Sequence, residues 1–282
     1  MNAIKRLFIK LGNINRQWIF FIVGLSVLIP LIYPINIPIQ TSVHSQTVYE
    51  ALKDLDEGSR ILLSFEYGPS TKPEIHPMAI GLLRLLFDKK HKIYGMALWP
   101  DGLFMSQEAF KQVADNELNL SYGNDYVNLG FKPGNEAVVK GVASDIRQLF
   151  SKDTKGNKLE SLPIMDGINN IKDFDFVFSL SAGFPGSKEW LQFATDPHQI
   201  PMSTGCTSIQ VTEVLPYVES GQIKGILAGM PGAAEFEKLI GIPGTATGLM
   251  AAQSFAHVAI IIFIILGNIT YYLKRKKGQK YS

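Results

Sequence analysis

The chain has 282 residues, of which 46% are hydrophobic and 18% charged, and its formal net charge is +2. So small a charge gives no support to nucleic-acid binding, and the single cysteine, Cys206, excludes an internal disulfide. The fold must therefore be held by its core, which a domain of about 200 residues can supply.

Two long uncharged runs, Trp18 to Ile35 and Leu249 to Leu273, predict transmembrane helices. A helix needs about 20 mostly apolar residues to cross a bilayer, and both runs approach or exceed that length. The predicted order starts with a cytoplasmic basic tail (1–17) and a signal-anchor helix (18–38). An extracytoplasmic α/β domain (39–244) follows, and then a second transmembrane helix (245–273) and a second cytoplasmic basic tail (274–282).

Charge predicts the orientation of these segments. The tails carry nine basic residues and no acidic residue, so all 25 acidic residues lie between the apolar runs, where the net charge is −7. Basic flanks stay on the cytoplasmic side of a membrane. We therefore expect both termini to be cytoplasmic and the middle domain to lie outside. A membrane stop signal explains the basic C-terminal run more simply than nucleic-acid binding does.

A cleaved signal peptide is the alternative for the first apolar run. Val43-His44-Ser45 resembles a weak cleavage site. The apolar run is longer than the usual 7–15 residues of a signal peptide, however, and Pro30, Pro34 and Pro38 separate it from that site. The pattern favours an uncleaved anchor.

Short apolar runs alternate with amphipathic stretches throughout the middle region. The predicted strands are residues 61–66, 92–99, 125–131, 174–183, 199–203 and 223–229. The predicted helices are residues 76–87, 106–118, 136–150, 207–218 and 233–240. A strand followed by a helix, repeated about six times, predicts a doubly wound α/β domain with a mainly parallel sheet. The polar stretch 152–161 is the expected surface loop.

Cys206 lies in the sequence STGCTS, at a predicted turn from strand to helix. Free N–H groups at such a turn favour an anion, which nominates a small anionic ligand and the residues Ser203, Thr204, Gly205, Thr207 and Ser208. The same position would activate Cys206 as a nucleophile, with His198, His76 or His91 as its base. A tight turn built from small residues, without any ligand, is the third interpretation.

Three further residues are ligand-binding candidates because they lie at or just after the carboxyl ends of predicted strands. They are Glu66, Lys132 and Ser181. The sequence around Lys132 lacks the phosphate-loop pattern, and the five histidines show no metal-ligand spacing. We therefore expect neither a metal nor a cofactor.

A short stretch from Gly205 to Gly229, above all VESGQIKGILAG, resembles the late strand-helix-strand of tripartite-tricarboxylate-type substrate-binding proteins. The resemblance covers under a tenth of the chain and implies ligand binding, without carrying over the role of any residue.

The second apolar run contains a pattern typical of helix packing. Small residues recur at every fourth position, at Gly244, Gly248, Ala252 and Ala256. Gln253 and His257 have the same spacing on the neighbouring face. Polar residues in a span usually face protein rather than lipid. This face predicts contact with another helix, in a homo-oligomer or with a membrane-protein partner.

The sequence thus predicts a two-span membrane protein with an extracytoplasmic α/β domain, which acts as a ligand-sensing or accessory subunit of a membrane assembly. One alternative is a cell-surface hydrolase that uses Cys206. The other is a structural subunit that self-associates.

Overall fold

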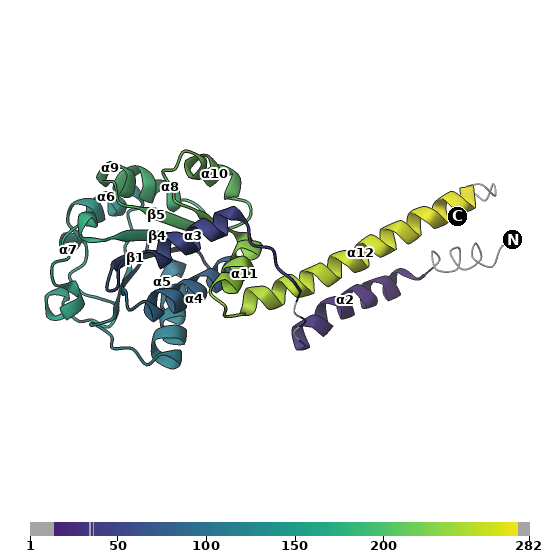
Figure 1. Cartoon of the computed structure of the whole chain (residues 1–282), viewed down its shortest axis with the longest axis horizontal. Coiled ribbons are helices and arrows are strands. Elements are labelled where there is room, and N and C mark those ends of the chain that lie inside the picture. The colour runs from purple at the N-terminus through teal and green to yellow at the C-terminus, as the bar shows by residue number, and fades with distance from the viewer. Residues whose placement is uncertain (1–13, 34, 36, 276–282) are drawn as a thin grey trace. The chain divides into compact units, whose positions relative to one another are not determined.

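The computed structural model describes residues 14–33, 35 and 37–275, and divides the chain into two units (Figure 1). One unit is the domain Ile39–Thr247, and the other holds the terminal segments Met1–Pro38 and Gly248–Ser282. The basic residues Lys5, Lys10 and Lys276, among others in the tails, lie outside the described residues.

Two apolar helices occupy the terminal segments. Helix α12 (Thr245–Arg275) has 31 residues, and within the described part of the chain it alone is long and apolar enough to span a membrane. Helix α2 (Arg16–Ile32) is apolar but has 17 residues. Its first turn is capped by Asn15, whose side chain accepts the N–H of Gln17 at 3.2 Å. Length and composition thus support the second predicted span more strongly than the first.

The domain contains one sheet of six parallel strands in the order β3-β2-β1-β4-β5-β6. The strands are β1 (Arg60–Glu66), β2 (Lys92–Ala97), β3 (Tyr126–Phe131), β4 (Phe176–Ser181), β5 (Met202–Cys206) and β6 (Ile226–Ala228). Nearly every strand residue is buried, as expected for strands covered on both faces. The order reverses between β1 and β4. The predicted doubly wound, parallel α/β domain is therefore confirmed.

Helices cover both faces of the sheet (Figure 1). The first layer consists of α3 (Val43–Lys53), α4 (Lys72–Asp88), α5 (Pro100–Phe110) and α11 (Gly229–Leu239). The second consists of α6 (Glu136–Ser144), α7 (Ile146–Leu149), α8 (Ser187–Trp190), α9 (Asp196–His198) and α10 (Val211–Glu219). Pi-helical turns at Lys111–Glu117 and Leu191–Thr195 continue α5 and α8. Helix α3 was not among the predicted helices.

The predicted boundary of β5 is wrong. The pattern places the strand at residues 199–203 and a turn after it, whereas β5 continues to Cys206. Its small residues are explained by close packing rather than by a turn. A Cβ atom at Gly205 would lie 2.6 Å from Sδ of Met78 on α4, so a larger residue there would displace that helix side chain.

Helix α11 binds the chain near both ends of the domain, at Ser42 and at Gly244 to Thr247. The carboxylate of Glu237 is 3% exposed and accepts the N–H groups of Gly244, Ala246 and Thr247 at 2.8–3.0 Å. Two residues earlier on the same helix, Glu235 accepts the N–H of Ser42 at 3.0 Å. The first turn of α12 therefore receives a carboxylate cap from the domain.

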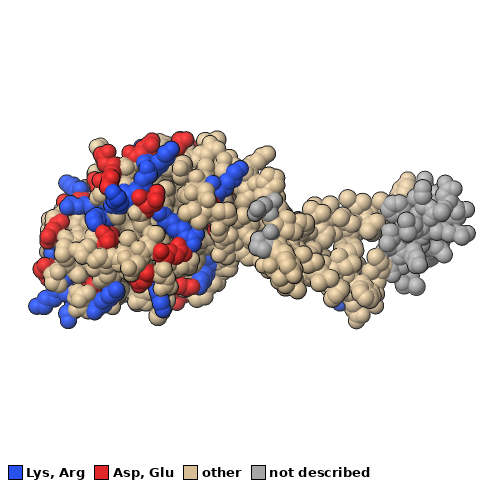
Figure 2. Space-filling model, turned by 60° about the horizontal axis from the view of Figure 1, so that its bottom comes forward, with Lys and Arg blue, Asp and Glu red and all other residues tan. Residues whose placement is uncertain are grey.

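The described surface of the domain is mixed in charge. Acidic and basic side chains alternate over the face in Figure 2, and neither sign forms a broad patch there. Exposed ion pairs such as Lys90–Glu57, at 2.9 Å, are screened by water and contribute little to stability. This face offers no electrostatic footprint for a polyanion.

Candidate functional site

In an open parallel sheet, ligands bind beyond the carboxyl ends of the strands where the strand order reverses. Here the reversal lies between β1, which ends at Glu66, and β4, which ends at Ser181. These two residues are paired in register, and the backbone N–H of Ala182 donates to the carbonyl of Glu66 at 2.8 Å. The topology thus directs attention to the chain just after Ser181.

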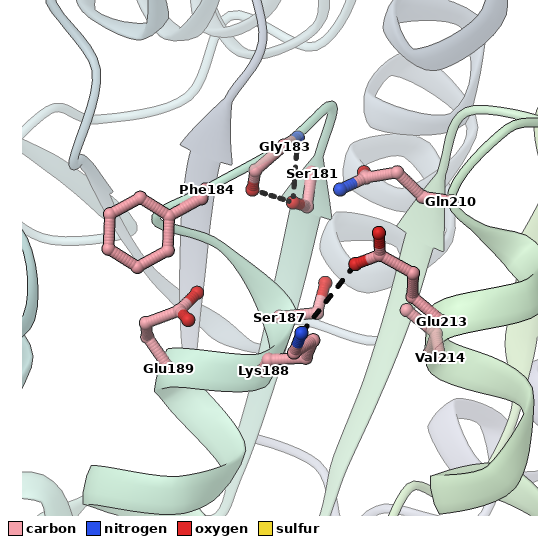
Figure 3. Close-up of a pocket in the computed structure, with 9 residues that line it drawn as sticks. All are labelled: Ser181, Gly183, Phe184, Ser187, Lys188, Glu189, Gln210, Glu213 and Val214. Carbon is pink, nitrogen blue, oxygen red and sulfur yellow. Dashed lines mark hydrogen bonds and ion pairs between the residues drawn. The ribbon is translucent and has the colours of Figure 1, made fainter.

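A small cavity of about 40 Å³ lies at that place, between the end of β4 and the first turns of α8 and α10 (Figure 3). It is lined by Ser181, Gly183, Phe184, Ser187, Lys188, Glu189, Gln210, Glu213 and Val214. A single water requires roughly 10–15 Å³ of such space, so the cavity has room for a small polar group. Its walls are mostly polar, which is unlike a gap in an apolar core.

The charged groups of the cavity come from two helices. Lys188 on α8 and Glu213 on α10 face each other with Nζ and Oε2 3.6 Å apart, and both are well exposed. Glu189 is 7% exposed, and its Oε2 accepts the N–H of Gly186 at 2.7 Å. Glu189 therefore caps the start of α8 while its carboxylate also forms part of the cavity wall.

Hydrogen bonds from Ser181 and Trp99 fix the loop after β4. Ser181 Oγ donates to the carbonyl of Gly183 at 3.0 Å, and the indole N–H of Trp99 donates to the carbonyl of Pro185 at 2.9 Å. A Cβ atom at Gly183 would lie 3.1 Å from the Trp99 ring, so the loop runs close over that ring. Phe184 is 62% exposed and also borders a second, open hollow with the first residues of α6.

Beneath the cavity a chain of buried hydroxyl groups leads into the sheet. Ser187 lines the cavity, and its Oγ lies 2.6 Å from Oγ1 of Thr204 and 3.2 Å from Oγ of Ser179. Ser179 in turn donates to Oε2 of Glu66 at 3.1 Å. These groups come from β1, β4, β5 and α8, and they connect the cavity to a carboxyl group in the core.

Glu66 is fully buried, and burial raises its pKa to about 8 despite hydrogen bonds from Ser64 and Ser179. The Ser64 hydroxyl donates to Oε1 of Glu66 and itself accepts the indole N–H of Trp190 at 2.9 Å. At neutral pH the carboxyl group is therefore mainly protonated, so it can donate as well as accept within the hydroxyl chain. The chain links the cavity wall to a titratable proton.

The structure does not bring the predicted nucleophile and its base together. Cys206 is the last residue of β5, at its carboxyl end. His198 precedes that strand and therefore lies toward its amino end. The Cys206 side chain is fully buried in the core beside residues such as Val214, and burial raises its pKa to about 12. His76 bonds to Tyr67 at 2.8 Å, and no described histidine contacts the thiol by a hydrogen bond. These surroundings stabilise the thiol over the reactive thiolate.

The predicted anion cradle is divided among separate environments. Ser203, Thr204 and Gly205 are buried strand residues, and Thr204 belongs to the hydroxyl chain. Thr207 forms the turn before α10, where its carbonyl accepts the N–H of Gln210 at 3.0 Å. The N–H and hydroxyl of Ser208 both donate to the carboxylate of Glu74, at 2.9 and 2.8 Å. An anion of the chain itself therefore occupies the place proposed for a ligand.

The remaining candidates have different surroundings. Ser181 lines the cavity, and Glu66 lies behind it in the sheet. Lys132 is half-buried, with Nζ 5.8 Å from the centroid of the Phe150 ring, and it does not line the cavity. Within the described residues, no three His, Cys, Asp or Glu side chains are grouped as metal ligands.

The small-residue face of α12 begins in the turn capped by Glu237. Gly244 precedes the helix and donates to that carboxylate, while Ala252 is 3% exposed. Gly248 and Ala256 are half-buried, and Gln253 and His257 are exposed in this single chain. The predicted contact with another helix stays a prediction.

Sequence reasoning missed five polar or charged residues of the cavity that follow the loop after β4 or the turn after β5. They are Ser187, Lys188, Glu189, Gln210 and Glu213. One signal was present, because a glutamate three residues after Gly186 fits a helix cap. That signal predicts a helix start, and only the packing of α8 against the loop shows that it borders a cavity.

Comparison of the chain with protein-family models, curated proteins and solved structures finds no match in any of the three. The chemistry of the site is therefore the basis for assigning a function.

Proposed function

We propose that this protein is a membrane-tethered ligand-sensing or accessory subunit, and that its ligand binds in the cavity after β4. In the proposed arrangement α2 and α12 both cross the membrane and the domain lies outside the cytoplasm. The charge split of the sequence supports the orientation, and the length and composition of α12 support the tether.

The observation that carries the ligand-binding proposal is a polar cavity at the carboxyl end of β4, one of the two strands between which the strand order reverses. Doubly wound sheets bind ligands beyond the carboxyl ends of strands near such a reversal. Lys188 and Glu213 come from different helices and stand on opposite sides of its opening. A ligand that contacted both would connect α8 with α10, so its binding would alter how these helices pack.

The contacts of α11 supply a physical route from this edge of the sheet to the start of α12. A Cβ atom at Gly229, the first residue of α11, would lie 2.0 Å from Oγ of Ser208 and 2.9 Å from Oε2 of Glu74. The other end of α11 carries Glu237, which caps the first turn of α12. A shift of the turn that contains Ser208 and leads into α10 would therefore press on α11. We propose that this contact transmits ligand binding to the membrane helix.

The cysteine-hydrolase alternative has less support. A catalytic thiol must be accessible and must lie near a base, whereas Cys206 is buried and its pKa is raised. The self-associating structural alternative rests on the spacing of small residues in α12.

The test is native purification of the full chain in mild detergent, followed by mass spectrometry of small molecules released on unfolding. Wild-type protein and the Glu219→Ala variant, whose substitution is exposed on α10 outside the cavity, should release the same compound. Lys188→Ala and Glu213→Ala should release at least tenfold less, because each removes a charged group at the opening. Equal recovery from all four proteins would place the ligand elsewhere, and recovery from none would contradict ligand binding under these conditions.

A further inference from the structure

We propose that the cavity binds the ammonium group of a small primary amine, such as a free amino acid. This inference rests on the proposed ligand-binding function and names the chemical class of the ligand. It follows from the kinds of hydrogen-bonding atoms that the walls present.

The cavity wall contains one acceptor without a donor. Gln210 Oε1 belongs to a lining residue, is shielded from solvent and accepts no hydrogen bond from the described residues. Within the described part of the chain, the carboxylate of Glu189 accepts the N–H of Gly186 at Oε2, and Glu189 also lines the cavity. A buried acceptor without a donor is unfavourable, so Gln210 Oε1 favours a ligand that donates a hydrogen bond.

The charged groups of the wall also favour a ligand with a positively charged donor. Two carboxylates, of Glu189 and Glu213, face a single ammonium group, that of Lys188. Lys188 is 3.6 Å from Glu213 and therefore offsets that carboxylate, while Glu189 forms no salt bridge with any described residue. A ligand ammonium group carries donors and a positive charge, so it suits a wall that contains the unpartnered Gln210 Oε1 and more carboxylates than ammonium groups.

The surroundings also define what the rest of the ligand can be. The exposed ring of Phe184 lies beside Glu189 at the rim, where an aromatic face attracts a cation (Figure 3). Lys188 at the opening could receive a carboxylate attached to the same ligand. The small volume of the cavity admits an amino group and its first carbon atoms, with any larger portion left outside.

The experiment uses the full chain in detergent and two pairs of probes. Glycine is compared with acetate, which lacks the amino group, and ethylammonium with ethanol, in which a neutral hydroxyl replaces it, by titration calorimetry at constant ionic strength. Concentrations reach about 100 mM, because ligands of so few atoms bind weakly. We expect saturable binding of glycine and ethylammonium, and at least tenfold weaker binding of acetate and ethanol.

Variants then locate the binding. Glu189→Gln keeps an oxygen for the Gly186 N–H but removes the charge, and Glu213→Gln changes an exposed side chain at low risk to folding. Each should weaken ethylammonium binding, Glu189→Gln by about tenfold or more, whereas Glu219→Gln should not. Lys188→Ala should weaken glycine more than ethylammonium.

Each other outcome contradicts a specific statement. Binding of acetate that is lost in Lys188→Ala would overturn the ammonium class while leaving the ligand site intact. Ethylammonium binding that survives in Glu189→Gln and Glu213→Gln would overturn the assignment to this cavity. Absence of saturable binding by both amines would overturn the inference, and the compound recovered by native purification would then decide independently whether the site binds anything.

Discussion

At the scale of single residues, the main feature is a buried carboxyl group that is connected by hydroxyl groups to the cavity wall. Glu66 is a carboxyl group in a fully buried position, where hydroxyl groups of Ser64 and Ser179 replace water. A charge is costly there, and the group keeps its proton instead. The same hydroxyl chain reaches Ser187 in the cavity wall, so the proton and the cavity share one hydrogen-bonded structure.

The raised pKa of Glu66 predicts how stability depends on pH. The folded chain holds this proton up to a pKa of about 8, whereas the unfolded chain releases it near 4.5. Between these values the folded state binds more protons, so this group lowers the free energy of unfolding by about 1.4 kcal/mol per pH unit as pH rises. Glu66→Gln keeps a neutral group of the same shape and should remove this contribution.

The measurement is urea unfolding of the full chain and of Glu66→Gln at several pH values from 5 to 8. The stability of the variant relative to wild type should increase steadily over that range. Parallel curves for the two proteins would show that Glu66 is ionised in the folded state.

Cys206 provides a second test at this scale. Its thiol is fully buried and its pKa is raised to about 12, so a thiol-specific reagent at pH 8 should not modify the native protein rapidly. Modification should follow the rate of unfolding and reach one thiol per chain in denaturant, because no other cysteine is present. Rapid labelling of the native protein, at the rate of a free thiol, would restore Cys206 as a candidate nucleophile.

At the scale of elements, α11 determines how the domain meets the chain segments that lead to the apolar helices. Glu237 receives three backbone N–H groups and the hydroxyl of Thr247 at 2.6 Å. Lys238 on the same helix donates to the carbonyl of Ile39. A single helix thus holds the chain both where it enters the domain and where it leaves it.

We expect Glu237→Gln to loosen the first turn of α12. The amide keeps one acceptor oxygen but loses the second and the negative charge that favours a helix N-terminus. Hydrogen exchange at residues 244–247 should accelerate by on the order of tenfold, since hydrogen bonds to a charged group contribute about 1.5–3 kcal/mol. Glu219→Gln serves as the control. Unchanged exchange at residues 244–247 would show that the cap contributes nothing to this turn.

At the scale of the whole molecule, membrane topology is the property on which the proposed function depends most. Nine basic residues flank the apolar runs and the region between them carries a charge of −7. Positively charged flanks resist translocation, so both termini should stay in the cytoplasm.

The topology is tested with reporter fusions. A reporter that is active only outside the cytoplasm should be active within residues 152–161, a surface stretch between β3 and β4, and silent after Ser282. A reporter with the opposite requirement should give the reverse result. Activity of the same reporter at both sites would leave a single span and contradict the two-span arrangement.

The sequence by itself determined the α/β class, the parallel sheet and the approximate position of each strand. These properties depend on local patterns, because a strand buried on both faces must be apolar at successive positions and must be followed by a helix that returns the chain. The same logic located the carboxyl ends of the strands, and so nominated Ser181 and Glu66 before their surroundings were visible.

Tertiary structure alone decided which of these ends borders a cavity and what each candidate contacts. Gly205 and Cys206 are strand residues because α4 and the core pack tightly around them. The sequence pattern does not distinguish this case from a turn, because small polar residues are common in both. The strand order places His198 away from Cys206, and the fold gives the backbone N–H of Ser208 to Glu74. Glu189, Gln210 and Glu213 line one cavity only because the fold brings the starts of α8 and α10 to the carboxyl end of β4. Contacts between residues distant in sequence depend on packing, which periodicity does not encode.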